Sequence, residues 1–330
     1  MKKILLLALT LSSPLAFAET AAAPGAEFAV PHRLVDIGGR KLNLFCSGTG
    51  SPTVVFESPS GSSGAAWWAV QRQVAAKTRA CVYDRAGFGF SDASPRAADA
   101  QSAVDDLHVL LKAAAIAPPY VLVGNSFGGG AAELFAWKHP DEVSGLVLVE
   151  PMHEDENLRA DAVTHGGISE GESQIIEFGN ACEAQSVKGF EPKSETWEEC
   201  IGGLDPSLPG SLADVDLKQR LAPAWWHARQ AERRSLAQDR AQLRAARQPF
   251  GTLPVIVLAR GVSPYLIPGK PPSDTNKAIE AANLALLTEV AQSSKNGEVR
   301  VVAGAGHVIQ ETHPDAVVAA VDDVLHRLRR

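Results

Sequence analysis

The chain has 330 residues and is 45% hydrophobic, which is ordinary for a globular protein with a sizeable core. Its formal net charge of −7 argues against a nucleic-acid partner, and no stretch approaches the roughly 20 apolar residues of a membrane span. The spacing of its cysteines and histidines does not resemble a zinc site, and the sequence predicts neither a metal nor a cofactor.

The first 18 residues have the three parts of a bacterial secretory signal. A lysine pair is followed by an apolar run and by an Ala-Phe-Ala cleavage site that ends at Ala18. We therefore expect export to the periplasm or the medium, with residues 19–31 as a loose leader. Removing the lysine pair changes the net charge from −7 to −9 (−7 minus 2). In an exported chain the four cysteines predict disulfides, for which three pairings exist.

After the leader, short apolar segments alternate with helical patterns. The sequence predicts strands at 32–37, 41–46, 53–57, 80–83, 121–123, 143–149, 254–259 and 298–303. It predicts helices at 65–76, 99–115, 222–247, 276–293 and 314–328, and another directly after Ser126. This alternation is typical of a mainly parallel sheet with helices on both faces. In such sheets the reactive groups lie at the carboxyl ends of the strands.

Residues 152–250 interrupt this alternation, because they are polar and helix-rich and contain no convincing strand. They are predicted to form an inserted helical cap between two core segments, 32–151 and 251–330.

Within the predicted cap, residues 222–247 read as one long helix with six arginines. A solvated face is the simplest interpretation of that charge. Trp225 and Trp226 are candidates for the wall of a pocket, and Cys182 and Cys200 also fall inside the cap.

The candidate nucleophile is Ser126, in Gly-Asn-Ser-Phe-Gly at 124–128. An apolar strand precedes this motif and a helical pattern follows it, so the serine lies on a sharp and strained turn beside a helix N-terminus. A serine hydroxyl needs a base within hydrogen-bond reach to act as a nucleophile at neutral pH. His307, on the glycine-rich loop 304–307 directly after a strand, fits this role.

Three motifs together resemble the α/β-hydrolase superfamily over residues 32–330. They are Gly-Asn-Ser-Phe-Gly at 124–128, Asp-Arg-Ala-Gly-Phe-Gly-Phe-Ser-Asp at 84–92 and Gly-Ala-Gly-His at 304–307. The set is similar to the capped branch with serine esterases, haloperoxidase-like hydrolases and proline iminopeptidase-like enzymes. The resemblance implies an eight-stranded, mainly parallel sheet with an inserted helical cap, and acyl transfer through Ser126 and His307.

The carboxylate that orients the base departs from the usual pattern of this family. It usually follows the seventh strand, but the segment 260–264, Arg-Gly-Val-Ser-Pro, contains no acid. Glu150, at the tip of the neighbouring strand, is our first candidate, because adjacent strand tips lie about 5 Å apart. Asp274 is the alternative, followed by Glu154 and Asp155. Glu150 has a second interpretation as a strand-end carboxylate that pairs with an arginine.

The oxyanion hole also departs from the family pattern. The backbone N–H of Phe127, directly after the nucleophile, is one expected donor. The second usually follows a His-Gly pair after the third strand, but Glu57 and Ser58 stand there and the next residue, Pro59, has no N–H. The sequence therefore points to the N–H of Ser60.

The resemblance also bears on the cysteines and on the motif at 84–92. In this fold the second strand lies antiparallel beside the fourth, which implies a Cys46–Cys81 disulfide and leaves Cys182–Cys200 within the cap. Asp84 and Arg85 are expected to pack the loops around the active site rather than to take part in chemistry.

The leading hypothesis is a serine hydrolase that cleaves small carboxylic esters through an acyl-enzyme. A serine nucleophile argues against the aspartate chemistry of epoxide hydrolases and dehalogenases of this fold. One alternative is an aminopeptidase of the proline iminopeptidase type, whose cap acids would hold a substrate ammonium. The acids available for this are Glu154, Asp155, Glu156, Glu170 and Glu172. The other alternative is a hydrolase-like binding protein without catalysis.

Overall fold

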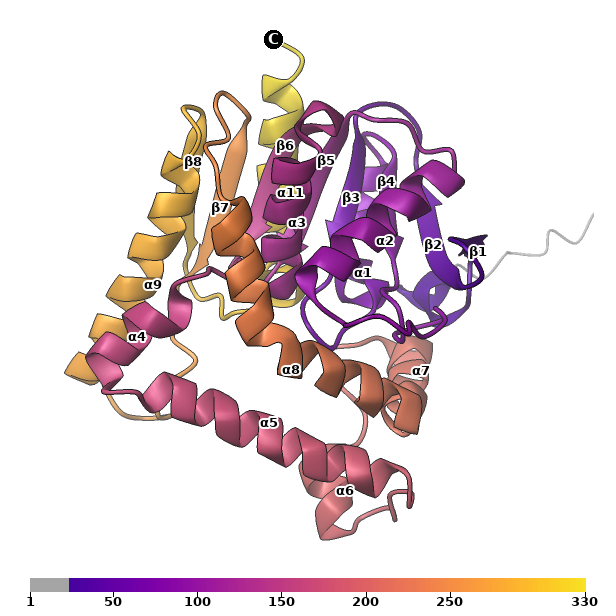
Figure 1. Cartoon of the computed structure of the whole chain (residues 1–330), viewed down its shortest axis with the longest axis vertical. Coiled ribbons are helices and arrows are strands. Elements are labelled where there is room, and N and C mark those ends of the chain that lie inside the picture. Colours follow the sequence, from indigo (N-terminus) through magenta and orange to yellow (C-terminus); the bar gives the residue numbers. More distant parts are fainter. Residues whose placement is uncertain (1–23) are drawn as a thin grey trace, which may run out of the picture.

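One eight-stranded sheet forms the centre of the molecule (Figure 1). The computed structural model describes residues 24–330, so the predicted signal at 1–18 lies outside the described residues. The strand order is β1-β2-β4-β3-β5-β6-β7-β8. β2 runs antiparallel to β1 and β4, and the other neighbours are parallel. This confirms the predicted mainly parallel sheet.

The strands are β1 (Arg33–Asp36), β2 (Lys41–Ser47), β3 (Thr53–Glu57), β4 (Ala80–Tyr83), β5 (Tyr120–Asn125), β6 (Val143–Val149), β7 (Val255–Arg260) and β8 (Gly297–Val302). The helices of the core are α1 (Trp68–Ala75), α2 (Ala100–Ala113), α3 (Phe127–Lys138), α9 (Asp274–Gln292), α10 (Ile309–Thr312) and α11 (Pro314–Arg327). The helices between β6 and β7 are α4 (Glu156–Thr164), α5 (Gly167–Ser186), α6 (Glu195–Cys200), α7 (Gly210–Arg220) and α8 (Pro223–Ala246). Short 3-10 turns are η1 (Ala26–Ala29), η2 (Gly64–Trp67) and η3 (Pro140–Glu142).

Helices cover both faces of the sheet, and each face has its own hydrophobic core. β3 shows why: Val55 packs into the cluster under α2, α3 and α9, whereas Val54 and Phe56 pack into the cluster under α1 and α11. Because successive side chains of a strand point to opposite faces, a strand covered on both faces must be apolar throughout.

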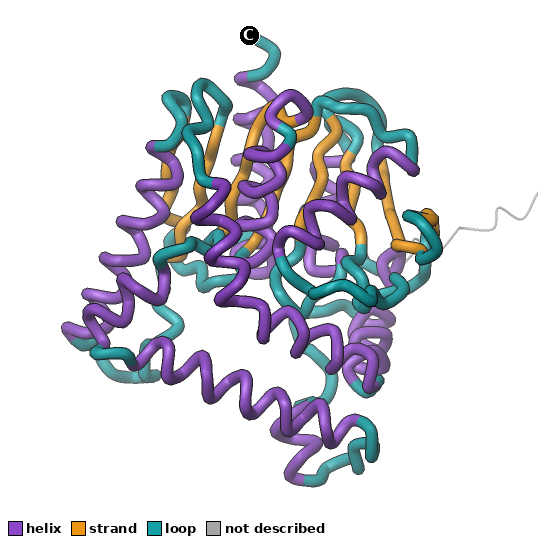
Figure 2. The backbone as a smooth tube through the Cα atoms, viewed as in Figure 1, coloured by secondary structure: helices purple, strands orange, loops and turns teal. Residues whose placement is uncertain are grey.

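The helices α4 to α8 form the inserted region predicted between the core segments. In the shared view of Figures 1 and 2 the helices α5, α6 and α7 lie below the sheet, and α8 runs back towards it. Leu243, near the end of α8, is buried in the same cluster as α2 and α3. The insertion is therefore anchored in the core through α8.

The expected loose leader differs from the structure where its residues are described. η1 lies within it, and Phe28 is buried in the cluster under α1 and α11. The Phe28 ring contacts the Phe45 ring edge-on, with 5.2 Å between the ring centroids. The His32 imidazole stacks parallel to the Phe45 ring, with 3.8 Å between the centroids. The aromatic side chain gains burial that the alanine-rich sequence of the leader did not indicate.

Two disulfides are present in the structure, and they join the pairs that the resemblance implies. Cys46 and Cys81 face each other across β2 and β4, where they are register partners. Cys182 on α5 and Cys200 at the end of α6 close a second loop within the insertion. No helix among residues 24–330 is long and apolar enough to cross a membrane.

Reduction of the protein is expected to lower its melting temperature. The two disulfides close segments with sequence separations of 35 and 18 residues. Each is expected to contribute roughly 2–4 kcal/mol through the unfolded chain. Thermal melts with and without dithiothreitol measure the effect. An unchanged melt, together with four titratable thiols in the untreated, denatured protein, would contradict it.

Candidate active site

Ser126 lies at the turn between β5 and α3 in a strained backbone conformation. Its φ of 55° and ψ of −121° are unusual for a residue with a side chain. The turn is held at both sides, because the Ser126 N–H donates to the Val149 carbonyl at 3.1 Å and its own carbonyl accepts from Met152 N–H at 2.9 Å. The hydroxyl is therefore presented by a rigid strand–turn–helix unit.

Two glycines make this turn sterically possible. A Cβ on Gly124 would lie 2.2 Å from the Gly128 carbonyl oxygen, and a Cβ on Gly128 would lie 2.4 Å from the Glu57 carbonyl oxygen. Both distances are far below van der Waals contact, so a side chain at either position would push the start of α3 away from β5 or β3. The two glycines thus let the start of α3 lie directly against the tips of β5 and β3.

His307 follows β8 on the glycine-rich loop and lies at the same cavity as Ser126. Its side chain is 43% exposed. Its Nδ1 is 3.4 Å from Oε2 of Glu150. Asn125, next to the nucleophile, donates from Nδ2 to the carbonyls of both Val149 (2.8 Å) and His307 (3.2 Å), which ties the histidine loop to the turn. Within the described residues, no hydrogen bond joins Ser126 to His307, and catalytic hydrogen bonds often tighten only with substrate bound.

Glu150 is buried at the tip of β6, where its backbone φ of 45° is also strained. Arg260, the last residue of β7, donates to it twice: the backbone N–H to Oε1 at 2.8 Å and the guanidinium to Oε2 at 2.5 Å. The sequence left two interpretations of Glu150 open, an acid for the histidine or a partner for an arginine. The structure shows contacts of both kinds.

These contacts decide the charge state of Glu150. Burial by itself would raise the pKa of its carboxyl, but the hydrogen bond from His307 and the charge and N–H of Arg260 outweigh burial and lower the pKa below its usual range. Glu150 is therefore a carboxylate at neutral pH, as a residue that orients an imidazole must be.

The alternative acids are engaged elsewhere. The side chain of Asp274 is 99% exposed in the first turn of α9, where it pairs with Lys277 at 2.9 Å. Glu154 pairs with Arg247, and Asp155 pairs with Arg244. Of the four candidates, only Glu150 makes a hydrogen bond to His307 among the described residues.

The cavity at Ser126 and His307 has a volume of about 540 Å³ and lies between the sheet and the insertion. Its wall comes from α4, α5, α8, α9 and the loop after β7. Most of this wall is apolar. The apolar lining is Ala160, Ile168, Ile175, Ile176, Leu236, Pro264, Ile279, Ala282 and Leu286. Such a cavity suits a small organic substrate better than a polymer chain.

The loop after β3, expected to supply the second oxyanion donor, is held by a buried arginine. Arg85 donates to the carbonyls of Ser58 (2.6 Å) and Pro59 (2.9 Å) and forms an ion pair with Glu232 of α8 at 2.8 Å. Glu232 in turn accepts hydrogen bonds from the Ser60 hydroxyl (2.9 Å) and from the Gly61 N–H (2.8 Å). Arg85 thus packs the loops as expected, and it also connects them to the insertion.

The two expected oxyanion donors, the N–H groups of Phe127 and Ser60, lie in different local structures. Phe127 opens α3, so its N–H has no acceptor inside the helix. The N–H of Ser60 makes no backbone hydrogen bond within the described chain. Neither residue is part of the described lining of the cavity that contains Ser126, and both oxyanion donors therefore stay predictions.

Glu57 occupies the strand tip where the family pattern has a histidine. It is fully buried, its Oε1 accepts from the Tyr83 hydroxyl at 2.7 Å, and Arg85 lies 3.9 Å from its Oε2. Burial raises the pKa of Glu57 to about 7, against the opposing effects of Arg85 and Tyr83. It packs beneath the loop and does not line the cavity of Ser126 among the described residues.

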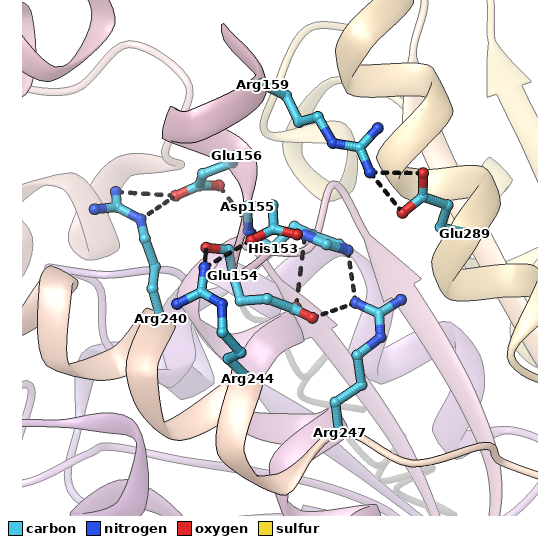
Figure 3. A network of polar contacts seen from close by, with 9 residues as sticks. All are labelled: His153, Glu154, Asp155, Glu156, Arg159, Arg240, Arg244, Arg247 and Glu289. Atoms are coloured by element: carbon cyan, nitrogen blue, oxygen red, sulfur yellow. Dashed lines mark hydrogen bonds and ion pairs between the residues drawn. The ribbon is translucent and has the colours of Figure 1, made fainter. Parts of the chain in front are cut away.

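The arginines of α8 are not the solvated face that the sequence predicts. Figure 3 shows Arg240, Arg244 and Arg247 reaching from this helix to the segment His153–Glu156. Arg240 also pairs with Glu172 of α5. These ion pairs fix the start of the insertion to its last helix.

The same pairs weigh against the aminopeptidase alternative. Glu154, Asp155, Glu156 and Glu172 each have an arginine partner. A substrate ammonium would have to displace a guanidinium from each of these carboxylates, and the contact of Arg240 with Glu172 uses both carboxylate oxygens. The fifth acid, Glu170, is exposed and accepts only from Gln174 at 3.3 Å.

Trp225 and Trp226 are also placed differently from the expectation. They pack edge-on at 5.1 Å in a separate small cluster with Phe88, Cys182 and Ile201. They are core residues of the insertion and do not belong to the described wall of the Ser126 cavity.

Among residues 24–330, one group of side chains has the spacing of metal ligands: His108, His139 and Glu142. His108 lies on α2, His139 directly follows α3 and Glu142 belongs to η3, and the two imidazoles stack with 3.8 Å between their centroids. Burial, together with the positive charges of His108, Lys112 and Lys138, lowers the pKa of His139 against the effect of Glu142. Positive neighbours disfavour a cation, and the group is remote from the cavity.

Residues 44–320 match the alpha/beta hydrolase family. The chain belongs to this family. It is 26% identical over 300 residues to 2-(acetamidomethylene)succinate hydrolase of Mesorhizobium japonicum, covering 89% of this chain and 94% of that one. A thermophilic esterase from Thermogutta terrifontis superposes with a TM-score of 0.56 at 22% identity, over 91% of this chain and 99% of the esterase.

Other relatives match over a shorter region. The uncharacterized protein YqjL of Bacillus subtilis is 36% identical over 104 residues, which is 32% of this chain and 41% of YqjL. The chain therefore spans less than half the length of some curated relatives that it matches.

Two residues of this hydrolase site were missed by sequence reasoning. Arg260 was noted only as a non-acidic residue, although an arginine directly after β7 and opposite a strand-end glutamate is a signal for an ion pair. Asn125 was read as part of the motif without a role. Its side chain also accepts from Gln310 at 3.1 Å, so it joins β5, β6 and the histidine loop.

Proposed function

We propose that this alpha/beta hydrolase cleaves carboxylic esters through an acyl-enzyme intermediate. The observation that carries the proposal is the shared cavity of Ser126 and His307, in which the Nδ1 of His307 lies 3.4 Å from the buried Glu150 carboxylate. With Nδ1 directed to Glu150, the other ring nitrogen is available as the base.

In the proposed mechanism, Ser126 Oγ attacks the ester carbonyl while Nε2 of His307 takes its proton. The same histidine then gives that proton to the oxygen of the leaving alcohol. The alcohol departs, and the acyl group remains bound to Ser126 Oγ as an ester. A water then attacks the acyl-enzyme while His307 takes its proton, the bond between the acyl carbon and Ser126 Oγ breaks, and His307 returns the proton to Oγ as the carboxylic acid leaves. Glu150 stabilises the imidazolium in both steps, and the N–H groups of Phe127 and Ser60 stabilise the oxyanion.

Substitution of the two reacting residues tests this proposal. Ser126→Ala and His307→Ala are each expected to lower kcat by several powers of ten, since triad members act as a unit. Hydrolysis of p-nitrophenyl acyl esters is the readout, and a fluorophosphonate should label the wild type stoichiometrically and leave Ser126→Ala unlabelled. Absence of labelling in the wild type would favour the catalytically inactive binding protein. Cleavage of proline p-nitroanilide without ester hydrolysis would favour the aminopeptidase.

The acid assignment has its own test. Glu150→Gln is expected to lower kcat by about 10²–10⁴-fold, because the imidazolium loses its carboxylate and the preferred tautomer changes. Asp274→Asn removes an exposed charge and is expected to leave the rate within about twofold. Steady-state kinetics of the two matched acid-to-amide variants measure the difference. A larger loss in Asp274→Asn than in Glu150→Gln would reverse the assignment.

We also propose that the protein is exported. The lysine pair, apolar run and Ala-Phe-Ala site of the first 18 residues support this, and two disulfides fit an oxidising compartment. Expression of the full chain in a Gram-negative host is expected to yield a periplasmic protein whose N-terminal residue is Glu19. Mass spectrometry of the purified N-terminus measures this, and an uncleaved cytoplasmic product would refute it.

A further inference from the structure

One cation on the wall of the cavity has no carboxylate partner. Arg233, on α8, lines the cavity together with Ser126 and His307. Within residues 24–330 its guanidinium makes no ion pair and no side-chain hydrogen bond, whereas its neighbour Arg234 pairs with Glu183 at 2.9 Å. Arg240, two turns further along α8, is likewise paired. Arg229 of the same helix also makes no ion pair among the described residues, but its guanidinium lies over the rings of Trp225 and Trp226, 4.9 and 5.7 Å from their centroids. Of the two arginines that line the described cavity, Arg260 is paired and Arg233 is not.

The partial burial of Arg233 makes the lack of a carboxylate partner among the described residues energetically unfavourable. Its side chain is half-buried, and burial lowers the pKa of its guanidinium, with Glu232 as the opposing charge. The carboxylate of Glu232 is already occupied by Arg85, Ser60 and Gly61. A partly desolvated cation of this kind is stabilised when an anion binds to it, and guanidinium matches a carboxylate in a bidentate geometry.

The other charged groups of the wall are already paired. Glu156 and Glu172 both contact Arg240, and Arg260 is held between Glu150 and Glu280. The cavity thus has an apolar wall, the candidate nucleophile Ser126, and the guanidinium of Arg233, which has no partner among the described residues.

We propose that Arg233 binds a carboxylate of the substrate, so that the preferred substrates are esters with a carboxylate remote from the scissile bond. This inference rests on the proposed ester hydrolysis. The guanidinium supplies charge and two parallel N–H donors, while the apolar wall packs the hydrocarbon between the carboxylate and the ester. Arg233 acts on substrate choice and not on the chemical step.

Matched pairs of esters test the proposal. Monoethyl esters of the linear dicarboxylic acids from succinate to suberate are compared with ethyl esters of fatty acids of the same carbon number, and 4-(butanoyloxy)butanoate is compared with butyl butanoate. The first set carries the carboxylate on the acyl side and the second on the alcohol side. In at least one set, the wild type should prefer the anionic ester in kcat/KM. Arg233→Gln should reduce that preference by about tenfold to a hundredfold, the range of a hydrogen bond to a charged group.

The controls are on the same helix. Arg234→Gln removes an identical charge outside the cavity and should keep the wild-type preference, and Arg233→Lys should keep part of it. Because Arg233 has no ion pair within the described residues, the melting temperature of Arg233→Gln should not fall below that of the wild type. A preference that is absent from both sets, or unchanged in Arg233→Gln, overturns the proposal.

A binding measurement separates this inference from the proposed function. Calorimetry with the preferred anionic ester is performed on Ser126→Ala, where the ester is not expected to be cleaved. Affinity should fall at least tenfold in Ser126→Ala/Arg233→Gln. If Ser126→Ala cleaves the ester while binding still depends on Arg233, the proposed mechanism fails and the anion site stands. If affinity is equal in both variants, the anion site fails whatever the mechanism.

Discussion

The close approach of three backbone segments at the nucleophile turn is the constraint on which the rest of the site depends. A side chain at Gly124 or Gly128 would overlap backbone atoms of α3 or β3, so the start of α3 can lie against the tips of β5 and β3 only because these residues are glycine. The N–H of Ser126 bonds to the end of β6, and its carbonyl accepts from Met152. One turn therefore fixes the candidate nucleophile, the end of β6 that precedes Glu150, and the loop expected to bind the oxyanion, and the strain at Ser126 is offset by this packing.

The turn needs a further support, because the loop after β3 has no regular structure of its own. Arg85 supplies it by holding two carbonyls of the loop, and Glu232 neutralises Arg85 from the inserted helix α8. A buried ion pair is weak evidence for stability, but losing either partner would leave an uncompensated buried charge. The insertion is therefore part of the active-site architecture as well as its cover. Its position is coupled to the loop that faces the nucleophile.

The sequence predicts well what depends on neighbouring residues. All eight strands follow from apolar segments between turn signals, and Ser126 and His307 follow from glycine-rich segments directly after strands. It predicts poorly what depends on pairs distant in the chain. The partners of Arg240 lie in α4 and α5, and those of Arg85 lie in β3 and α8, so charge patterns alone suggested a solvated helix. Burial of Phe28 was missed for the same reason, since its partner Phe45 belongs to β2.

The unusual position of the acid becomes intelligible through Arg260. An unpaired arginine at the tip of β7 would oppose the formation of an imidazolium on the nearby His307. Here Arg260 is shared between Glu150 and Glu280, so two carboxylates face one guanidinium and the group keeps a net charge of −1 (two negative and one positive). The group formed by Glu150, Arg260 and Glu280 therefore presents negative charge to His307. Arg260 also fixes the orientation of Glu150 through two hydrogen bonds. Under the proposed mechanism, an acid at the end of β6 can therefore take the role of one after β7, because Arg260 holds its carboxylate in place.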